Sequence, residues 1–191
     1  MMEVTVLKYL LDNRDKEHNI RSISKATRMD YKNVHTLVAK LQKMALVEIQ
    51  PFGNVRRVIL TPHIHPLLFQ SEYERRENLA KNKNIRLILK HLTEVPFPFA
   101  ALLFGSFAKG KQTKHSDYDI LAISEKEIKA LSILPLDIHI THVTPEEFIQ
   151  MTRSKEFTVV SEANTYNVPL IGIEDYYRLL EYAHRTTYQN S

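Results

Sequence analysis

Two apolar runs separated by a short polar segment limit the second half of this chain to folds with a buried sheet. The first run, Phe99 to Phe104, ends in Gly105-Ser106, and the second, Ile120 to Ile123, directly follows Asp117-Tyr118-Asp119. Short apolar runs that end at a glycine turn are typical of buried strands. Residues two apart in a strand point to the same face, so the two aspartates are expected to project together. Such a pair repels itself unless a cation lies between the carboxylates.

A third aspartate lies in the next alternating segment, Leu136 to Ile140. Asp137 stands there between apolar neighbours, and Glu125 and Glu127 are nearby competitors for its role. Aspartates from adjacent strands would form an all-oxygen ligand set, which suits Mg²⁺ or Mn²⁺. The two-residue period puts His139 on the face of Asp137, although a histidine in this position is more often packed or solvated.

The segment between the two apolar runs has the residues of a phosphate-binding turn. Gly105 lets the backbone approach a ligand closely, Ser106 adds a hydroxyl, and a helix starting there would direct its amides at an anion. Lys109, Lys111 and Lys114 follow in the loop and could neutralise phosphate charge. The pattern predicts a phosphate-binding turn beside a metal site.

The combined pattern of Gly105-Ser106, ten residues and then Asp117-x-Asp119 resembles the DNA polymerase beta-type nucleotidyltransferase superfamily, in particular its minimal members. The resemblance implies a two-metal transfer of a nucleoside monophosphate, with AMP from ATP as the expected reaction. It also implies that Asp117 and Asp119 bind both ions, while Asp137 completes one site and is the candidate general base. Larger members carry an extra helical domain for which this chain has little room. The acceptor therefore stays undefined, and a second copy or another partner subunit could complete the site.

The first half of the chain differs in charge. Residues 1–94 hold 17 lysines and arginines against 10 acidic residues, a net charge of +7, whereas residues 95–191 hold 9 against 12, a net charge of −3. The first half therefore suits a polyanion and the second suits cations.

Periodicity in this basic half predicts three helices, at about Val4–Leu11, Ile20–Thr27 and from the N-cap Asp30 to about Ala45. Two β-compatible runs, Leu46–Gln50 and Val55–Leu60, then predict a hairpin through Pro51-Phe52-Gly53-Asn54. This order, over about residues 1 to 62, resembles the winged helix-turn-helix domains of prokaryotic transcription regulators.

That second resemblance implies binding to DNA through the third helix and the hairpin. The residues expected to touch bases or phosphates are Lys32, Asn33, His35, Lys40, Arg56 and Arg57. The alternative is a protein-docking or dimerisation module in which these are ordinary solvated side chains.

The sequence thus predicts an α+β chain in three parts: a winged helix-turn-helix domain at 1–62, a helical connector at 63–94 and a nucleotidyltransferase α/β domain at 95–191, with a small mixed sheet flanked by helices. The connector is expected to be one long or kinked helix from Ser71 to about Leu92, weakest at Asn82-Lys83-Asn84. The last part is expected to contain helices at Pro145–Thr152, Val159–Tyr166 and Glu174–Arg185, and a strand at Pro169–Ile173.

Composition narrows the chemistry. The chain has no cysteine, which excludes disulfides and thiolate ligands, and it has no apolar run near the roughly 20 residues that span a bilayer. We expect a soluble, cytoplasmic protein without a membrane partner. Three functions remain open: a metal-dependent nucleotidyltransferase using ATP or another NTP, a DNA-binding regulator that senses nucleotide without turnover, and an antitoxin-type enzyme that modifies a small helical partner.

Overall fold

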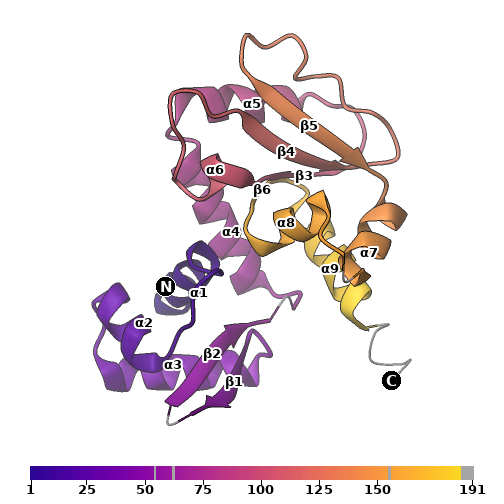
Figure 1. Ribbon diagram of the computed structural model, residues 1–191. Coiled ribbons are helices and arrows are strands. Elements are labelled where there is room, and N and C mark those ends of the chain that lie inside the picture. The colour runs from indigo at the N-terminus through magenta and orange to yellow at the C-terminus, as the bar shows by residue number, and fades with distance from the viewer. Residues whose placement is uncertain (54, 62, 155, 186–191) are drawn as a thin grey trace. The chain divides into compact units, whose positions relative to one another are not determined.

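The computed structural model describes residues 1–53, 55–61, 63–154 and 156–185, and the chain divides into two compact units, Met1–Glu74 and a second from Arg75 onward (Figure 1). Helices and a small mixed sheet occur together, which confirms the expected α+β class. No helix in these ranges combines the length and the apolar character needed to cross a membrane.

The first unit begins with three helices and a hairpin, in the order that the sequence predicted. The helices are α1 (Met2–Asp12), α2 (Ile20–Thr27) and α3 (Tyr31–Lys43), and the antiparallel strands are β1 (Val47–Phe52) and β2 (Val55–Leu60). Asn54 of the predicted turn lies outside the described residues.

Side-chain caps explain where α2 and α3 begin. The Asn19 side chain accepts a hydrogen bond from the Ser22 amide at 2.9 Å, and the Ser22 hydroxyl accepts one from the Asn19 amide at 3.0 Å. Asp30 caps α3 by accepting from the Lys32 amide at 2.8 Å. Each cap satisfies amides that have no partner within the helix, so the capping residue fixes the first turn.

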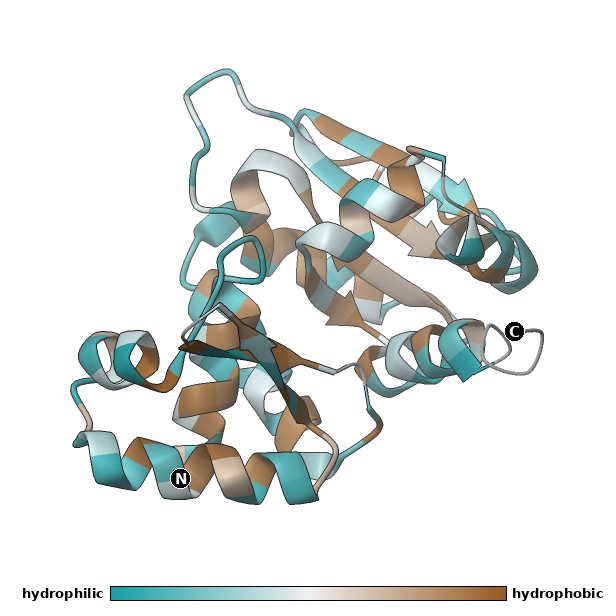
Figure 2. Ribbon diagram, turned by 60° about the horizontal axis from the view of Figure 1, so that its bottom comes forward, coloured by the Kyte–Doolittle hydropathy of each residue, from teal (hydrophilic) through white to brown (hydrophobic). Residues whose placement is uncertain are grey.

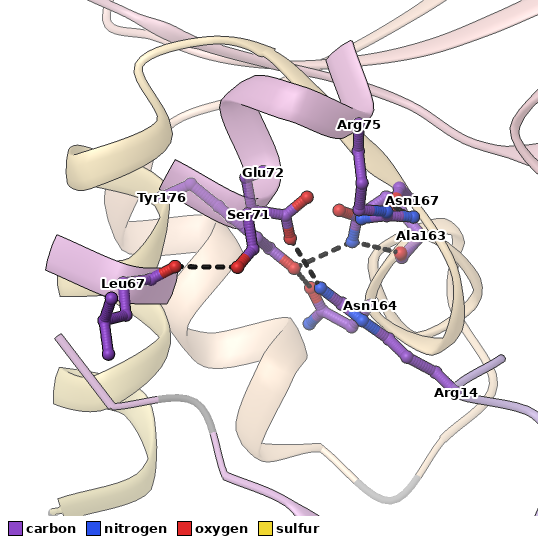
Figure 3. Close-up of polar contacts among 9 residues, drawn as sticks. All are labelled: Arg14, Leu67, Ser71, Glu72, Arg75, Ala163, Asn164, Asn167 and Tyr176. Carbon is purple, nitrogen blue, oxygen red and sulfur yellow. Dashed lines mark hydrogen bonds and ion pairs between the residues drawn. The ribbon is translucent and has the colours of Figure 1, made fainter. Parts of the chain in front are cut away.

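The core of the first unit is formed by the apolar stripe of each helix and by one face of the hairpin. Its fully buried members include Val6, Leu7, Leu11, Ile23, Val34, Val38, Leu41 and Leu46. One ion pair is also buried, because Arg14 donates to Glu72 at 2.8 Å and Glu72 has no exposed surface (Figure 3).

The predicted connector helix is two helices, α4 (Pro66–Leu79) and α5 (Lys83–Thr93). The break falls at the expected weak point, because the Asn82 side chain accepts from the Asn84 amide at 2.9 Å and so caps α5. Asparagine competes for backbone amides in this way and favours caps over helix interiors. Helix α4 starts at Pro66, five residues before the expected Ser71, because a proline is tolerated in the first turn of a helix. The division between the two units falls within α4.

The second unit contains a sheet of order β5-β4-β3-β6 within the described residues. Its strands are β3 (Ala100–Leu103), β4 (Tyr118–Ile123), β5 (Ile138–Val143) and β6 (Val168–Ile171). Strand β3 is antiparallel to both of its neighbours, whereas β4 and β5 are parallel, so the sheet is mixed as predicted.

Helices pack against both faces of this sheet. Because the side chains of β4 point alternately to the two faces, its odd-numbered and even-numbered residues have different neighbours. Tyr118, Ile120 and Ala122 belong to the buried cluster that contains Ile85 and Ile88 of α5. Successive strand residues point to opposite faces, so Asp119 belongs to the other face. On that side α8 (Val159–Thr165) contacts β4, and α9 (Ile173–Arg185) contacts β3 and β6. Figure 2 shows hydrophobic and hydrophilic residues alternating along the helices in keeping with this packing.

A polar network fixes the start of β6 next to α8 and α9 (Figure 3). Arg75 donates to the Asn167 carbonyl at 3.0 Å, and the Asn167 side chain donates to the Ala163 carbonyl at 2.7 Å and to the Tyr176 hydroxyl at 2.8 Å. Asn167 and Tyr176 are completely buried, so these bonds offset the cost of removing polar groups from water.

Helix α7 (Pro145–Arg153) begins at a capping box made by Thr144 and Glu147.

Candidate active site

The two aspartates of the Asp-x-Asp pattern lie at the start of β4. Asp117 directly precedes the strand, and Asp119 is its second residue. Between them, Tyr118 stacks on Phe107 with a centroid distance of 3.9 Å, and its hydroxyl accepts a hydrogen bond from Asn84 at 3.0 Å. This buried tyrosine anchors the segment, so the flanking carboxylates are held on the side of β4 opposite α5.

The structure gathers Asp117, Asp119 and His139 into one group whose potential metal-ligand atoms all lie within 4.8 Å of one another. Asp119 and His139 are register partners on the parallel strands β4 and β5, and the Asp119 Oδ1 to His139 Nδ1 distance is 3.7 Å. In the described part of the chain, no lysine or arginine forms an ion pair with either aspartate.

The electrostatics of this group favour a cation. Partial burial raises the pKa of the Asp119 carboxyl above its ordinary value, and the neighbouring Asp117 carboxylate raises that pKa further. His139 lowers the pKa of Asp119, whereas Glu162 on α8 raises it. A like charge close by disfavours ionisation, and a bound cation would remove that cost.

The role expected of Asp137, as third metal ligand and general base, stays a prediction. Asp137 precedes β5, its side chain is exposed, and it is not part of the three-residue group. Its backbone carbonyl accepts a hydrogen bond from the Tyr118 amide at 2.8 Å, which aligns the starts of β4 and β5. This register brings His139, two residues further along, beside Asp119. The alternative acids Glu125 and Glu127 are also exposed and lie outside the group.

Gly105 lies close to the Asp119 carboxylate. It follows β3, begins the short helix α6 (Gly105–Ala108) and has a φ of +69°, in the left-handed region that favours glycine. A Cβ atom at this position would lie 2.2 Å from Asp119 Oδ2, well inside van der Waals contact. The Phe104 amide also donates to the Asp119 carbonyl at 3.0 Å. The glycine therefore leaves room for the Asp119 carboxylate.

The loop after this turn is open and basic. Lys109, Lys111 and Lys114 are exposed, and the Lys111 amide donates to the Ser106 carbonyl at 2.9 Å. Ser106 itself is half-buried. The lysine side chains are therefore available to an anion that approaches from solvent.

The six candidate DNA-binding residues of the first unit lie in three kinds of surroundings. Lys40 pairs with Glu3 at 2.6 Å, and Arg57 pairs with Glu17 at 2.8 Å while its guanidinium lies over the Phe52 ring. The side chains of Lys32 and Asn33 are exposed at the first turn of α3.

His35 and Arg56 line a groove among α2, α3 and the start of β2. The other residues lining this groove are Asn19, Ile20, Arg21, Ser24, Lys25, Tyr31 and Val55. None of these side chains is acidic. Sequence reasoning missed Arg21 and Lys25, because it considered only the third helix and the hairpin.

Comparison with protein families matches residues 78–168 to the family described as polymerase beta, nucleotidyltransferase. The matched stretch includes Gly105, Ser106, Asp117, Asp119 and β5, and it lies entirely within the second unit. The match supports a relationship of this part of the chain to the nucleotidyltransferase superfamily and a transferase activity of that type. Neither the comparison with curated proteins nor that with solved structures found a match.

Proposed function

We propose that the second unit is a metal-dependent nucleotidyltransferase that transfers AMP from ATP to an acceptor. The observation that carries the proposal is the group of Asp117, Asp119 and His139, whose potential ligand atoms lie within 4.8 Å of one another in the stretch that matches the family. Within this group, Asp119 lies against Gly105. Neither carboxylate is neutralised by a lysine or arginine of the described chain, so the pair is free to bind a cation.

The ligand set fits a divalent ion. Carboxylate oxygens suit Mg²⁺ and Mn²⁺, and an imidazole nitrogen is accepted more readily by Mn²⁺ than by Mg²⁺. Asp117, Asp119 and His139 would hold the ion, which when bound lowers the pKa of an acceptor hydroxyl and offsets charge on the phosphates. The remaining coordination positions would be filled by water and by the substrate.

The chain's own groups would do the rest of the work. Lys109, Lys111 and Lys114 would bind the triphosphate by charge, and the Gly105-Ser106 turn would let it approach the backbone. Asp137 is the proposed general base, which would accept the acceptor's proton as the new bond to the α-phosphorus forms and pyrophosphate leaves. Its exposed position just before β5 leaves the carboxylate accessible to an acceptor from solvent.

The proposal is tested by incubating the purified protein with ATP labelled at the α-phosphate, with Mg²⁺ or Mn²⁺, alone and with cell extract. Label transferred to an acceptor and release of pyrophosphate are expected. The Asp117→Asn, Asp119→Asn variant should lose both signals, whereas the control variant Glu125→Gln, Glu127→Gln should keep them. Equal signals from these two variants, or no label transfer by the native protein with any NTP, would refute the proposal.

A second candidate function belongs to the first unit, which we propose binds duplex DNA. The supporting observation is the groove lined by Arg21, Lys25, His35 and Arg56, which has no acidic side chain and has Tyr31 at its edge. Cations of this kind contact phosphates, and the exposed start of α3 is suited to a major groove.

Binding to random-sequence duplex DNA tests this second proposal. The Arg21→Glu, Arg56→Glu variant should weaken binding and reduce its dependence on salt. The Lys40→Glu variant serves as the control, since Lys40 is already paired with Glu3. The idea fails if the native protein leaves the duplex unbound or if both variants bind equally.

A further inference from the structure

A second basic surface lies on the catalytic unit and plays no part in the proposed reaction. Residues 75–94 carry six lysines and arginines against two acidic residues, Glu77 and Glu94. This is a net charge of +4 over two helices, in a half of the molecule whose remaining residues, 95–191, are net negative. The segment therefore differs in charge from the unit to which it belongs.

Helix α5 buries its apolar residues on one side and exposes its basic residues on the other. Ile85, Ile88 and Leu92 are buried in the sheet core, with at most 1% of their surface exposed. Arg86 and Lys90 are exposed and are four residues apart, so they share the outer side of the helix. At a rise of about 1.5 Å per residue, their backbone positions are roughly 6 Å apart along the axis. Two cations at this spacing can contact successive phosphates of one strand.

These two residues form one wall of a groove between α4 and α5. Its lining residues are Arg76, Glu77, Ala80, Lys81, Arg86, Leu89, Lys90 and Thr93. Glu77 is the one acidic residue of this lining, and it pairs with Arg76 at 3.2 Å. Within the described chain, Lys81, Arg86 and Lys90 form no ion pair with an acidic side chain. The groove therefore keeps an excess of positive charge.

Hydrogen bonds to neutral acceptors hold the side chains of the groove in place and leave their positive charges unpaired by an acidic group. Arg86 Nε donates to the Ala80 carbonyl at 3.2 Å, and Lys81 donates to the Asn78 side chain at 3.0 Å. Both acceptors are neutral, so the guanidinium and the ammonium keep their full charges. Arg86 also keeps its terminal nitrogens for a further ligand, and a guanidinium can bind a phosphate through two parallel hydrogen bonds.

We propose that this groove binds the phosphate backbone of a nucleic-acid strand. Charge complementarity and the spacing of the cations favour a polyanion with regularly repeated phosphates. A membrane surface fits less well, because binding there requires an apolar face, and the groove offers only the half-buried Ala80 and Leu89. Contacts of this kind fix position on the strand and carry no sequence preference.

The groove is separate from the metal site. Arg86 and Lys90 lie on the outer side of α5, and the inner side of α5 packs on the face of β4 that carries Tyr118. Asp119 points to the opposite face of the same strand. Binding in the groove is therefore independent of whether the second unit turns over nucleotide, and it does not rest on the proposed function.

The test measures binding of a fluorescent single-stranded RNA to the full-length protein over a range of salt concentrations, with the same DNA sequence in parallel. The measurement is made with the native first unit and again with Arg21→Glu, Arg56→Glu, so that binding by the first unit is removed. The groove variant is Lys81→Glu, Lys90→Glu. The control, Lys129→Glu, Arg178→Glu, makes the same change in charge at two exposed residues outside the groove.

Loss of two phosphate contacts should reduce the slope of log affinity against log salt by roughly 1.4 for a single strand. The groove variant should show this reduction and should bind RNA more weakly at low salt. The control variant should bind RNA like the protein with the unchanged groove. A Lys81→Arg, Lys90→Arg variant, which keeps the charge, should retain binding and so guards against a folding defect in the glutamate variant. Binding of the same variants to vesicles containing anionic lipid is measured in parallel. The inference is overturned if the groove and control variants bind RNA and DNA alike, or if the two lysines matter only for binding to the vesicles.

Discussion

Replacing Gly105 with alanine tests the geometry of the site most directly. The new Cβ would lie 2.2 Å from Asp119 Oδ2 and 3.1 Å from Asp119 Cγ, so the carboxylate must move. A residue with a side chain also pays about 1–2 kcal/mol for the left-handed conformation at φ +69°. If the carboxylate stays in place, overpacking adds roughly 1–3 kcal/mol. If it rotates away, stability is spared but the cation loses a ligand.

Gly110, five residues later and just after α6, provides a matched control. Its φ is +63°, yet a Cβ there would meet nothing within 4 Å. Gly110→Ala should therefore show only the conformational cost, about 1–2 kcal/mol. The difference between the two variants isolates the contact with Asp119.

The assay combines urea denaturation without metal and titration of Mn²⁺ by calorimetry. Gly105→Ala should lose Mn²⁺ binding, lose more stability than Gly110→Ala, or both, since the clash must be relieved in one of these ways. Gly110→Ala should bind Mn²⁺ like the native protein. If both variants match in Mn²⁺ affinity and in unfolding free energy, the close contact between Gly105 and the carboxylate does not shape the site.

Further outcomes follow from the same region. Because the pKa of Asp119 is raised, Mn²⁺ affinity should fall as pH decreases through that pKa, and Asp117→Asn should move the midpoint to lower pH in a calorimetric pH series. The metal-free protein should lose stability as pH rises through the same pKa, and Asp119→Asn should flatten this dependence in urea titrations. His139→Ala should weaken Mn²⁺ binding at least about tenfold while Asp137→Asn changes it less, and the reverse order would make Asp137 the third ligand. Thr144→Ala should cost about 1 kcal/mol of unfolding free energy through loss of the α7 cap, with an unchanged denaturation curve as the contrary result.

The sequence predicted the order of elements because the signals that set helix ends and buried strands are local. Asp30 and Thr144 cap helices through amides two or three residues away, which can be seen without any tertiary structure. The division of the connector at Asn82 belongs to the same class, since the asparagine was identified as a weak point. The sequence allowed either a bend or a break at this point, and the structure has the break.

The site was predictable in part. The pairing of Asp117 with Asp119 follows from their separation of two residues, but the third ligand depends on the register of β5 against β4. Asp137 and His139 share a face, so periodicity alone could not decide which of them lies beside Asp119. The backbone bond from the Tyr118 amide to the Asp137 carbonyl sets this register and places His139 beside Asp119, and it joins residues 19 positions apart.

Surface charges were the least predictable part. Lys40 and Arg57 find acidic partners 37 and 40 residues away, which no local pattern reveals. The basic groove between α4 and α5 could not be predicted for a related reason. In the sequence its lysines and arginines continue the basic first half of the chain, although in the structure they belong to the second unit.

The pairing of β3 has a consequence for how the second unit assembles. Leu102 pairs with Pro169, 67 residues later in the chain, whereas β3 and β4 are joined by a much shorter segment. Closing so long a loop costs entropy before any contact repays it, and such pairings slow folding. During synthesis, β3 must therefore wait with one edge unpaired until β6 has left the ribosome. A chain that stops before α8 would present that edge to other chains and should aggregate more readily.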